Sequence, residues 1–462
     1  MHMIVHLDLK GAPLKIAFLE RVLSSIKKWG ATGILIEWED SFPYTGVIAN
    51  IGSLTDASGD GMYTVEEVKH ILYCAKENEL EVIQLVQTIG HMEFVLKHPC
   101  YRKCQEKARS PAVLCPSQTN SQELVRTMVL QALEIQPDAK YFHIGADEVW
   151  HTAVCIKCQY RAIPNNLGPL SLYLEHIRDL ALFIKQQRPD LTILMWDDML
   201  RSTSANVLQH YKLGELVQPV VWNYNVKADF SINPQTWDCY RTIFPSSWVA
   251  SAFKGASGSC EVYPNTDRYV NNQEAWIDEV QKVASVNFAG VVLTGWSRYD
   301  HFATLCELLA VSMECLRSCL HVWNKFMTNS CQRTALERKM GLTEGVLGQE
   351  FIHTMKIFMK LRDRSQQLLH SDLVATWLNP WQIEHGYTNP AHLELIANES
   401  ITLIRELTAL RSTIQRLLAT VTGSRSTNEW VGTFITPLLK KLTDVQDLAI
   451  RRYNIDASVK PI

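Results

Sequence analysis

Residues 141–150 read Tyr-Phe-His-Ile-Gly-Ala-Asp-Glu-Val-Trp, an apolar run that ends in two adjacent carboxylates and an aromatic side chain. Neighbouring residues on a strand point to opposite faces, so Asp147 and Glu148 can serve one ligand only where the strand stops and the backbone turns. That place is where α/β enzymes keep their reacting groups. A solvated loop is the ordinary explanation of such a pair, but it has no use for the flanking His143 and Trp150. We therefore predict a functional acid pair.

The same pattern of strand and helix recurs along the first two thirds of the chain. Each short apolar run is followed by a stretch of helical period, and continuous apolar character is typical of parallel strands buried on both faces. Eight such units predict an α/β fold, a parallel sheet closed into a (β/α)8 TIM barrel. The seventh strand has the weakest pattern. The predicted strands are Met3–Leu7, Gly33–Glu37, Glu81–Val86, Tyr141–Gly145, Thr192–Trp196, Pro219–Trp222, Ser247–Ala250 and Gly290–Thr294.

The last third of the chain has a different character, because strand signals vanish and amphipathic helical patterns take over. We predict a catalytic barrel over residues 1–335 and a C-terminal helical region over residues 336–462, packed on the barrel. The predicted long helices are Ile352–Leu369 and His392–Leu418, with breaks at Asn379-Pro380 and Asn389-Pro390.

Composition excludes several classes of partner. The 462 residues carry a net charge of −3 with the two signs well mixed, so we expect no nucleic acid and no membrane surface as a partner. The longest apolar runs are too short to span a bilayer. No signal core follows Met1, which favours a cytoplasmic location, with the nucleus as an alternative. A homodimer is left open.

Twelve cysteines are unusual for such a chain. Most stand singly, where a free thiol behaves as a small buried apolar residue, and reduced thiols are the default without secretion. Cys155 and Cys158 have metal or redox spacing and follow His151, yet no second pair lies nearby. We therefore expect no metal and no cofactor. The other cysteines that could in principle contribute are Cys100, Cys104 and Cys115.

Polar or aromatic side chains follow every predicted strand, and a barrel gathers them on one rim. Tryptophans beside acids recur there, which favours a carbohydrate, since apolar sugar faces pack on indole while acids bind hydroxyls. These side chains include Asp8, Trp38, Glu39, Asp40, Gln87, His91, Glu93, Asp147, Glu148, Trp150, Trp196, Asp197, Asp198, Trp222, Asn223, Tyr224, Phe253, Lys254, Trp296, Arg298, Tyr299, Asp300 and His301.

At these positions the chain resembles glycoside hydrolase family 20, the β-N-acetylhexosaminidases, and within it the hexosaminidase D branch. The Gly-x-Asp-Glu element is specific to the family, and the other segments point to the branch. The matching segments run in order across roughly the first 310 residues. They are His-Leu-Asp-Leu-Lys-Gly at 6–11, Leu-Ile-Glu-Trp-Glu-Asp-Ser-Phe-Pro-Tyr at 35–44, Val-Gln-Thr-Ile-Gly-His-Met-Glu-Phe at 86–94, His-Ile-Gly-Ala-Asp-Glu-Val at 143–149, Trp-Asp-Asp-Met-Leu at 196–200, Ala-Ser-Ala-Phe-Lys-Gly-Ala at 250–256 and Thr-Gly-Trp-Ser-Arg-Tyr-Asp-His at 294–301.

The resemblance implies a retaining exo-hydrolase that removes terminal β-linked N-acetylgalactosamine or N-acetylglucosamine from glycoconjugates by substrate-assisted catalysis. The substrate's own 2-acetamido oxygen attacks the anomeric carbon, and water opens the resulting oxazolinium ion with retention. Asp147 is implied to stay ionised and to orient the acetamido group. Glu148 is implied to protonate the leaving oxygen and later to activate water. Neither role needs a metal.

The resemblance also implies which side chains bind the sugar. Three tryptophans are expected to wall the pocket, with Trp296 as its floor, and His91 to pair with an acid and support Glu148. Asp8 and Asp300 are candidates for binding ring hydroxyls. The complete implied set is Asp8, His91, Trp196, Trp222, Tyr224, Trp296, Tyr299 and Asp300.

Two departures from the family pattern leave substrate recognition open. The usual arginine after strand one is replaced by Leu-Asp-Leu-Lys at 7–10, so other groups must grip the hydroxyls. The usual tyrosine after strand seven is absent from 252–254, and its role passes to Tyr224 or Tyr299, of which we favour Tyr224. The branch is associated with a nucleocytoplasmic location and a preference for N-acetylgalactosamine.

Two other functions compete with this one. A metal-dependent barrel hydrolase is imaginable with His91, His143 and Asp197, but the ligand spacing is poor. A sugar-binding barrel without catalysis is a second alternative. The intact pair of Asp147 and Glu148 argues against it, because a binding module gains little from buried acids.

Overall fold

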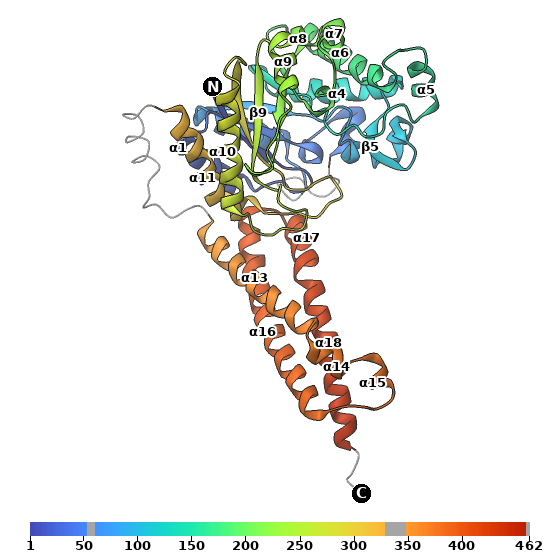
Figure 1. Ribbon diagram of the computed structural model, residues 1–462, viewed down its shortest axis with the longest axis vertical. Coiled ribbons are helices and arrows are strands. Elements are labelled where there is room, and N and C mark those ends of the chain that lie inside the picture. The colour runs from blue at the N-terminus through green and yellow to red at the C-terminus, as the bar shows by residue number, and fades with distance from the viewer. Residues whose placement is uncertain (53–60, 329–347, 459–462) are drawn as a thin grey trace. The chain divides into compact units, whose positions relative to one another are not determined.

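The computed structural model describes residues 1–52, 61–328 and 348–458 of the chain (Figure 1). The chain divides into two compact units, Met1–Leu347 and Gly348–Ile462. The border expected at residues 335 and 336 falls between 329 and 347, outside the described residues.

The first unit is built on a closed barrel of eight parallel strands, which confirms the predicted TIM barrel. The barrel order is β1, β10, β9, β8, β7, β6, β3, β2, so β1 closes the sheet by pairing with both β10 and β2. All eight predicted strands are present, the weak seventh one included. Their bounds are β1 His2–Asp8, β2 Gly33–Glu37, β3 Glu81–Leu85, β6 Tyr141–His143, β7 Thr192–Trp196, β8 Val217–Trp222, β9 Ser247–Lys254 and β10 Phe288–Gly295.

Helices follow the strands and pack around the barrel, as buried parallel strands require. The strand interiors are mostly apolar, and one core cluster, which includes Trp196 and Trp248, runs through the barrel from Ile4 of β1 to Val292 of β10. The main helices of this unit are α1 Ile16–Lys28, α2 Val65–Glu77, α4 Thr119–Ile135, α5 Ile156–Ala162, α6 Pro169–Gln187, α7 Ala205–His210, α8 Leu213–Leu216, α9 Pro234–Ile243, α10 Thr266–Lys282 and α11 Leu309–Met327.

One segment of the barrel unit has a helix and two strands that were not predicted from the sequence. Between β3 and α4 the chain forms a short helix, α3 (Glu93–Leu96), and an antiparallel hairpin of β4 (Gln105–Lys107) and β5 (Ser110–Leu114). The hairpin turns at Arg109, whose φ of 66° is unusual for a residue other than glycine. Its strands are too short to show an alternating pattern in the sequence.

The second unit is helical, as predicted. Its long helices α13 and α16 contain the two predicted ranges, and α16 contacts both α13 and α18. Asn379 and Asn389 cap the helices that follow them, which explains the predicted breaks. No described helix is both long enough and apolar enough to cross a membrane. The helices of this unit are α13 Gln349–Leu369, α14 Asp372–Trp377, α15 Pro380–Glu384, α16 Pro390–Val421, α17 Ser424–Phe434 and α18 Thr436–Ser458.

Candidate active site

The turn after β6 carries the acid pair. The strand ends at His143, two residues earlier than predicted, because Gly145 and Ala146 adopt left-handed backbone with φ of 64° and 71°. A residue of helix α6 stabilises this turn, since the Tyr173 hydroxyl donates a hydrogen bond to the carbonyl of Ala146 at 2.9 Å. Glu148 also has positive φ, at 49°. This reversal of the backbone removes the strand alternation that would have separated the two acids.

His91 joins the two carboxylates. Its Nε2 lies 3.4 Å from Oδ2 of Asp147 and 3.3 Å from Oε2 of Glu148. A side chain on the preceding Gly90 would overlap the carbonyl oxygen of Asp147, so only glycine allows the loops to approach this closely. Burial by itself lowers the pKa of His91, but the neighbouring Asp147 and Glu148 outweigh it and raise that pKa well above its usual value. The imidazolium therefore holds both acids on one side of the site.

Each acid has a further support. Gln87 donates from Nε2 to Oδ1 of Asp147 at 3.2 Å. The backbone N–H of Glu148 donates to Oδ2 of Asp198 at 2.9 Å, and Trp222 donates from Nε1 to Oδ1 of the same carboxylate at 3.3 Å. Asp198 follows β7, so it ties the acid loop to the ends of β7 and β8. Burial, and after it the charge of Asp147, raises the pKa of Asp198 to about 7.

This raised pKa predicts a pH-dependent stability that Asp198→Asn removes. A carboxyl with a pKa raised from 3.8 binds its proton more tightly in the folded protein, so it stabilises the fold at low pH and loses that contribution as pH rises through about 7. One such proton changes the free energy of unfolding by up to about 1.4 kcal/mol per pH unit. We expect the midpoint of thermal unfolding to fall less between pH 5 and 8 in Asp198→Asn than in the wild type. The exposed Asp363→Asn is the control, and equal slopes in all three proteins would contradict the assignment.

A cavity of about 410 Å³ opens in front of the acids. Its size is within the range of about 300–1,000 Å³ that small-molecule sites have. Trp196 and Trp296 lie 5.9 Å apart between ring centroids, and Trp222 stacks on Tyr224 at 5.3 Å. The structure thus brings together eight of the ten residues proposed from sequence, namely His91, Asp147, Glu148, Trp196, Trp222, Tyr224, Trp296 and Tyr299.

Asp8 and Asp300, proposed as hydroxyl ligands, do not line this cavity. Asp8 is buried behind the wall, where its carboxylate accepts from Lys10 Nζ at 3.1 Å and from the backbone N–H of Ser297 at 2.7 Å. Asp300 accepts instead from two backbone N–H groups of its own turn, Phe302 and Ala303, at 2.7 and 2.9 Å. Both oxygens of Asp8 and Oδ1 of Asp300 are thus engaged within the protein, which the sequence could not show.

Comparison with known proteins agrees with this geometry. The glycosyl hydrolase family 20 catalytic domain matches residues 38–244. The human protein Hexosaminidase D is 32% identical over 464 residues, which cover 96% of this chain and 94% of the human one. The chain belongs to glycosyl hydrolase family 20.

Other relatives of this family 20 glycoside hydrolase support the assignment. Bovine Hexosaminidase D is 39% identical over 318 residues, covering 69% of this chain and 90% of the bovine one. A β-N-acetylhexosaminidase from Bacteroides fragilis superposes with a TM-score of 0.52 and 12% identity over 76% of this chain and 73% of its own. At that identity the likeness concerns the barrel fold alone.

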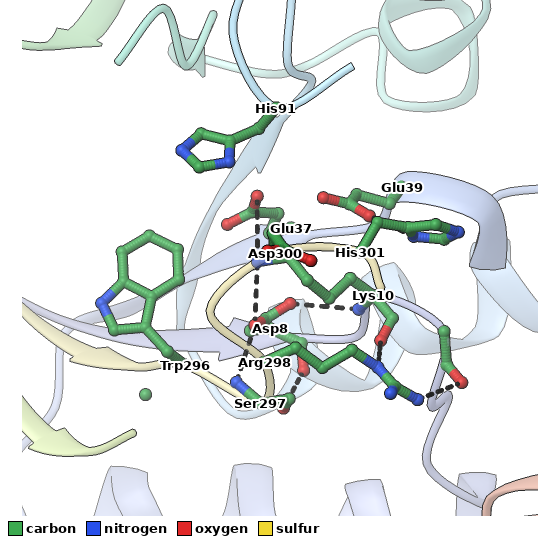
Figure 2. Close-up of polar contacts among 12 residues, drawn as sticks. Asp8, Lys10, Glu37, Glu39, His91, Trp296, Ser297, Arg298, Asp300 and His301 are labelled. Carbon is green, nitrogen blue, oxygen red and sulfur yellow. Dashed lines mark hydrogen bonds and ion pairs between the residues drawn. The ribbon is translucent and has the colours of Figure 1, made fainter. Parts of the chain in front are cut away.

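The family 20 cavity also contains charged residues that were not among the proposed site residues. Lys10 and Glu37 line it from the ends of β1 and β2. Lys10 Nζ lies 3.7 Å from Oε1 of Glu37 and 4.9 Å from the centroid of the Trp296 ring. Figure 2 shows the contacts of Asp8 with Lys10 and Ser297. Burial alone would lower the pKa of Lys10, but Asp8 and Glu37 raise it well above its usual range, so the ammonium stays charged.

Three arginines complete the charged part of the lining. Arg201 donates to both carboxylate oxygens of Asp197 at 2.8 and 2.7 Å and to the carbonyl of Trp222 at 2.6 Å. This bidentate pair fixes the end of β8, where Trp222 lies. The sequence does contain a signal for this ion pair, because Asp197 and Arg201 are four residues apart directly after a predicted strand. The additional lining residues are Lys10, Glu37, Gln87, Arg201, Asn223, Asn225, Gly255, Ala256, Arg268 and Arg298.

Within the described ranges three groups of side chains have the geometry to hold a cation, and none includes a residue that lines the cavity. In the group containing His301, Lys97 Nζ already lies 2.7 Å from Nε2 of that histidine and 3.8 Å from Oδ2 of Asp40, so a cationic side chain occupies the neighbourhood. The groups are Glu39, Asp40 and His301; Glu20, His70 and Cys74; and Glu106, Cys115, Cys155 and Cys158.

Proposed function

We propose that the protein is a retaining exo-β-N-acetylhexosaminidase that uses its substrate's acetamido group as the nucleophile. The observation that carries this proposal is the convergence of two adjacent acids, Asp147 and Glu148, on one nitrogen of His91. Both acids line a cavity walled by three tryptophans. A retaining enzyme with a protein nucleophile needs carboxyl groups on opposite sides of the sugar, about 5–5.5 Å apart. Asp147 and Glu148 are instead adjacent on one loop and share one histidine, which fits a mechanism in which the substrate supplies the nucleophile.

The two acids are proposed to divide the chemistry according to their surroundings. Asp147 accepts a hydrogen bond from Gln87 Nε2 at 3.2 Å and lies 3.4 Å from Nε2 of His91, so two donors hold its carboxylate in place. It would hold the acetamido N–H and offset the positive charge that develops on the oxazolinium ring. Glu148 is the more exposed of the pair and stands at the cavity lining. It would donate a proton to the leaving oxygen and then take one from the attacking water.

The remaining acid of the lining is poorly placed to act as a nucleophile. Glu37 is engaged on both oxygens, since Oε2 lies 3.1 Å from Nε2 of His6 and Oε1 lies 3.7 Å from Nζ of Lys10. Burial alone would raise the pKa of Glu37, but Lys10 outweighs it and the pKa is lowered. We propose that Lys10, whose ammonium group lines the cavity, binds a ring hydroxyl in place of the arginine that the family pattern has after its first strand.

Tyr224 is proposed to hold the acetamido oxygen. Its ring is stacked on Trp222 and lies 6.5 Å from Trp296, inside the aromatic part of the cavity. Burial raises the pKa of Tyr224 above its usual range, so the hydroxyl keeps its proton and can donate it in a hydrogen bond. Tyr299, the alternative, is 45% exposed and lies where solvent competes for the same bond.

The first test is hydrolysis of 4-nitrophenyl N-acetyl-β-galactosaminide and of its gluco epimer by the purified full-length protein. We expect turnover, faster on the galacto epimer as the branch resemblance implies, and a β-configured first product in proton NMR. An α-configured first product would contradict retention. A folded sample that binds N-acetylgalactosamine but turns over neither epimer would instead support the sugar-binding barrel.

Cellular location and substrate source belong to this proposal as well. We propose terminal N-acetylhexosamines of cytoplasmic, or else nuclear, glycoconjugates as the substrates. The described cysteines support a reducing compartment, because all of them are free thiols.

A further inference from the structure

Three thiols and one carboxylate meet beside the loop that follows the acid pair. They come from separate parts of the barrel unit, namely strand β4, the end of β5, and the loop and helix at α5. Figure 1 shows β5 and α5 at the same end of this unit. We call this group the Cys3Glu cluster, and its members are Glu106, Cys115, Cys155 and Cys158.

The spacing of the sulfur atoms is that of metal ligands. Sγ of Cys115 lies 3.4 Å from Sγ of Cys155 and 3.5 Å from Sγ of Cys158. A disulfide would bring two sulfurs to about 2.0 Å. Ligands of a tetrahedral zinc ion at about 2.3 Å lie about 3.8 Å apart. All four ligand atoms of the cluster lie within 4.8 Å of one another.

The carboxylate is held in place with one oxygen left over. Oε1 of Glu106 accepts from the backbone N–H groups of Val154 and Cys155 at 2.6 and 3.1 Å. Oε2 is buried and has no hydrogen-bond partner among the described residues. Glu106 is 1% exposed, so bulk water does not reach this oxygen, and leaving it without a partner costs free energy. A cation among the sulfurs would satisfy it.

A second layer of donors points at the sulfurs, as around known metal sites. Arg161 donates from NH1 to the Ser117 hydroxyl at 2.8 Å, which leaves the hydroxyl hydrogen of Ser117 for Cys158 Sγ at 2.9 Å. The backbone N–H of Cys158 donates to Sγ of Cys155 at 3.4 Å. The apolar side chains of Ala162 and Leu172 pack with Cys115 and Cys158 in one buried cluster.

We propose that the Cys3Glu cluster binds one structural zinc ion. Cys155 and Cys158 supply the two-residue spacing seen in the sequence, and the hairpin supplies the other two ligands. The sequence predicts no metal here because no second cysteine pair lies near Cys155 and Cys158. The unpredicted hairpin replaces that pair.

Binding would exchange protons for metal. Zn²⁺ displaces the three thiol protons, which leave to solvent, and the carboxylate binds in its ionised form, with no change of oxidation state. The ion would link the hairpin after β3 to the segment that begins at Asp147. It would thereby fix the position of the loop that carries the acid pair relative to the loop that carries His91.

The proposal is tested by the metal content of the full-length protein, purified without a metal-binding tag and measured by mass spectrometry. We expect one zinc per chain in the wild type and in Cys260→Ser, an exposed thiol outside the cluster. Cys158→Ser should fall to background, and Glu106→Gln, which keeps an oxygen for the two N–H groups, should lose zinc to a chelator faster than the wild type. Background zinc in the wild type after growth with added zinc would overturn the proposal, as would equal zinc in Cys158→Ser and Cys260→Ser.

A second measurement on the unaltered protein covers the case in which Cys158→Ser does not fold. Replacing zinc with Co²⁺ should produce thiolate-to-cobalt charge-transfer absorption in the near ultraviolet and the strong visible bands of four-coordinate cobalt. Weak bands of six-coordinate cobalt, or a disulfide between any two of the three cysteines in peptides from the native protein, would overturn the proposal. These readouts do not depend on glycosidase activity, so the inference stands or falls separately from the proposed function.

Discussion

Glu148→Gln is expected to lower kcat/KM by an amount that depends on the leaving group. A general acid contributes about 10²–10⁴-fold, and a poor leaving group needs its proton most. We therefore expect a loss near 10⁴-fold for a 4-methoxyphenyl N-acetyl-β-hexosaminide and near 10²-fold for the 2,4-dinitrophenyl one. The ratio kcat/KM is the quantity to measure, because it reports the first irreversible step and excludes the later role of Glu148 as base.

The control is Glu314→Gln, the same chemical change on the exposed face of α11. This variant should leave kcat/KM on both substrates unchanged. An equal loss on the two leaving groups in Glu148→Gln would contradict the role of Glu148 as proton donor. Circular dichroism of each variant separates a chemical effect from unfolding.

Asp147→Asn is expected to lower kcat/KM by about 10²–10³-fold on both leaving groups alike. The carboxylate is proposed to stabilise positive charge on the oxazolinium ring, and removing one such preorganised contact costs about that much. It does not move the leaving-group proton, so the loss should not depend on the leaving group. Gln87 and His91 can still reach an amide at this position, which limits structural damage.

Asp363→Asn, on an exposed part of α13, serves as the matched control here too. A loss in Asp147→Asn that grows as the leaving group becomes poorer would transfer the acid role from Glu148 to Asp147. An unchanged rate would remove Asp147 from the mechanism.

Much of the barrel was predictable because parallel strands that are buried on both faces appear in the sequence as continuous apolar runs. Gly33–Glu37 and Thr192–Trp196 are buried apolar runs, and their predicted bounds are those of β2 and β7. Strand β6 was predicted two residues too long, because the sequence from 141 to 145 does not reveal that Gly145 is left-handed. Periodicity reports which residues are buried, but not where the backbone turns.

The acid pair and the aromatic wall were predictable for a different reason. Each follows a strand directly, and barrel topology brings all strand ends to one rim. Asp8 ends its strand and Asp300 lies in the loop after the last one, yet neither lines the cavity, because Lys10 binds Asp8 and the turn after Tyr299 binds Oδ1 of Asp300. Position along a strand selects candidates, while local hydrogen bonding decides which of them face the ligand.

The Cys3Glu cluster, in contrast, could not be predicted from the position of its residues along the strands. Cys155 and Cys158 were visible as a pair, but Cys115 and Glu106 lie about 40 and 50 residues earlier and come close only through the hairpin. A site assembled from both a loop and a hairpin has no sequence period. The sequence offered Cys115 only as one of three possible contributors, and three-dimensional proximity selects it and adds Glu106.

The central claim, that the substrate's acetamido oxygen is the nucleophile, is tested most directly by changing that oxygen's basicity. Fluorine atoms on the acetyl methyl group withdraw electrons from the carbonyl in steps, from N-acetyl to N-trifluoroacetyl. If the carbonyl oxygen attacks the anomeric carbon, kcat/KM of the wild-type protein on 4-nitrophenyl substrates should fall steeply with each fluorine. If it stays constant across the series, the nucleophile is not the acetamido group, and the mechanism proposed for Asp147 and Glu148 is wrong.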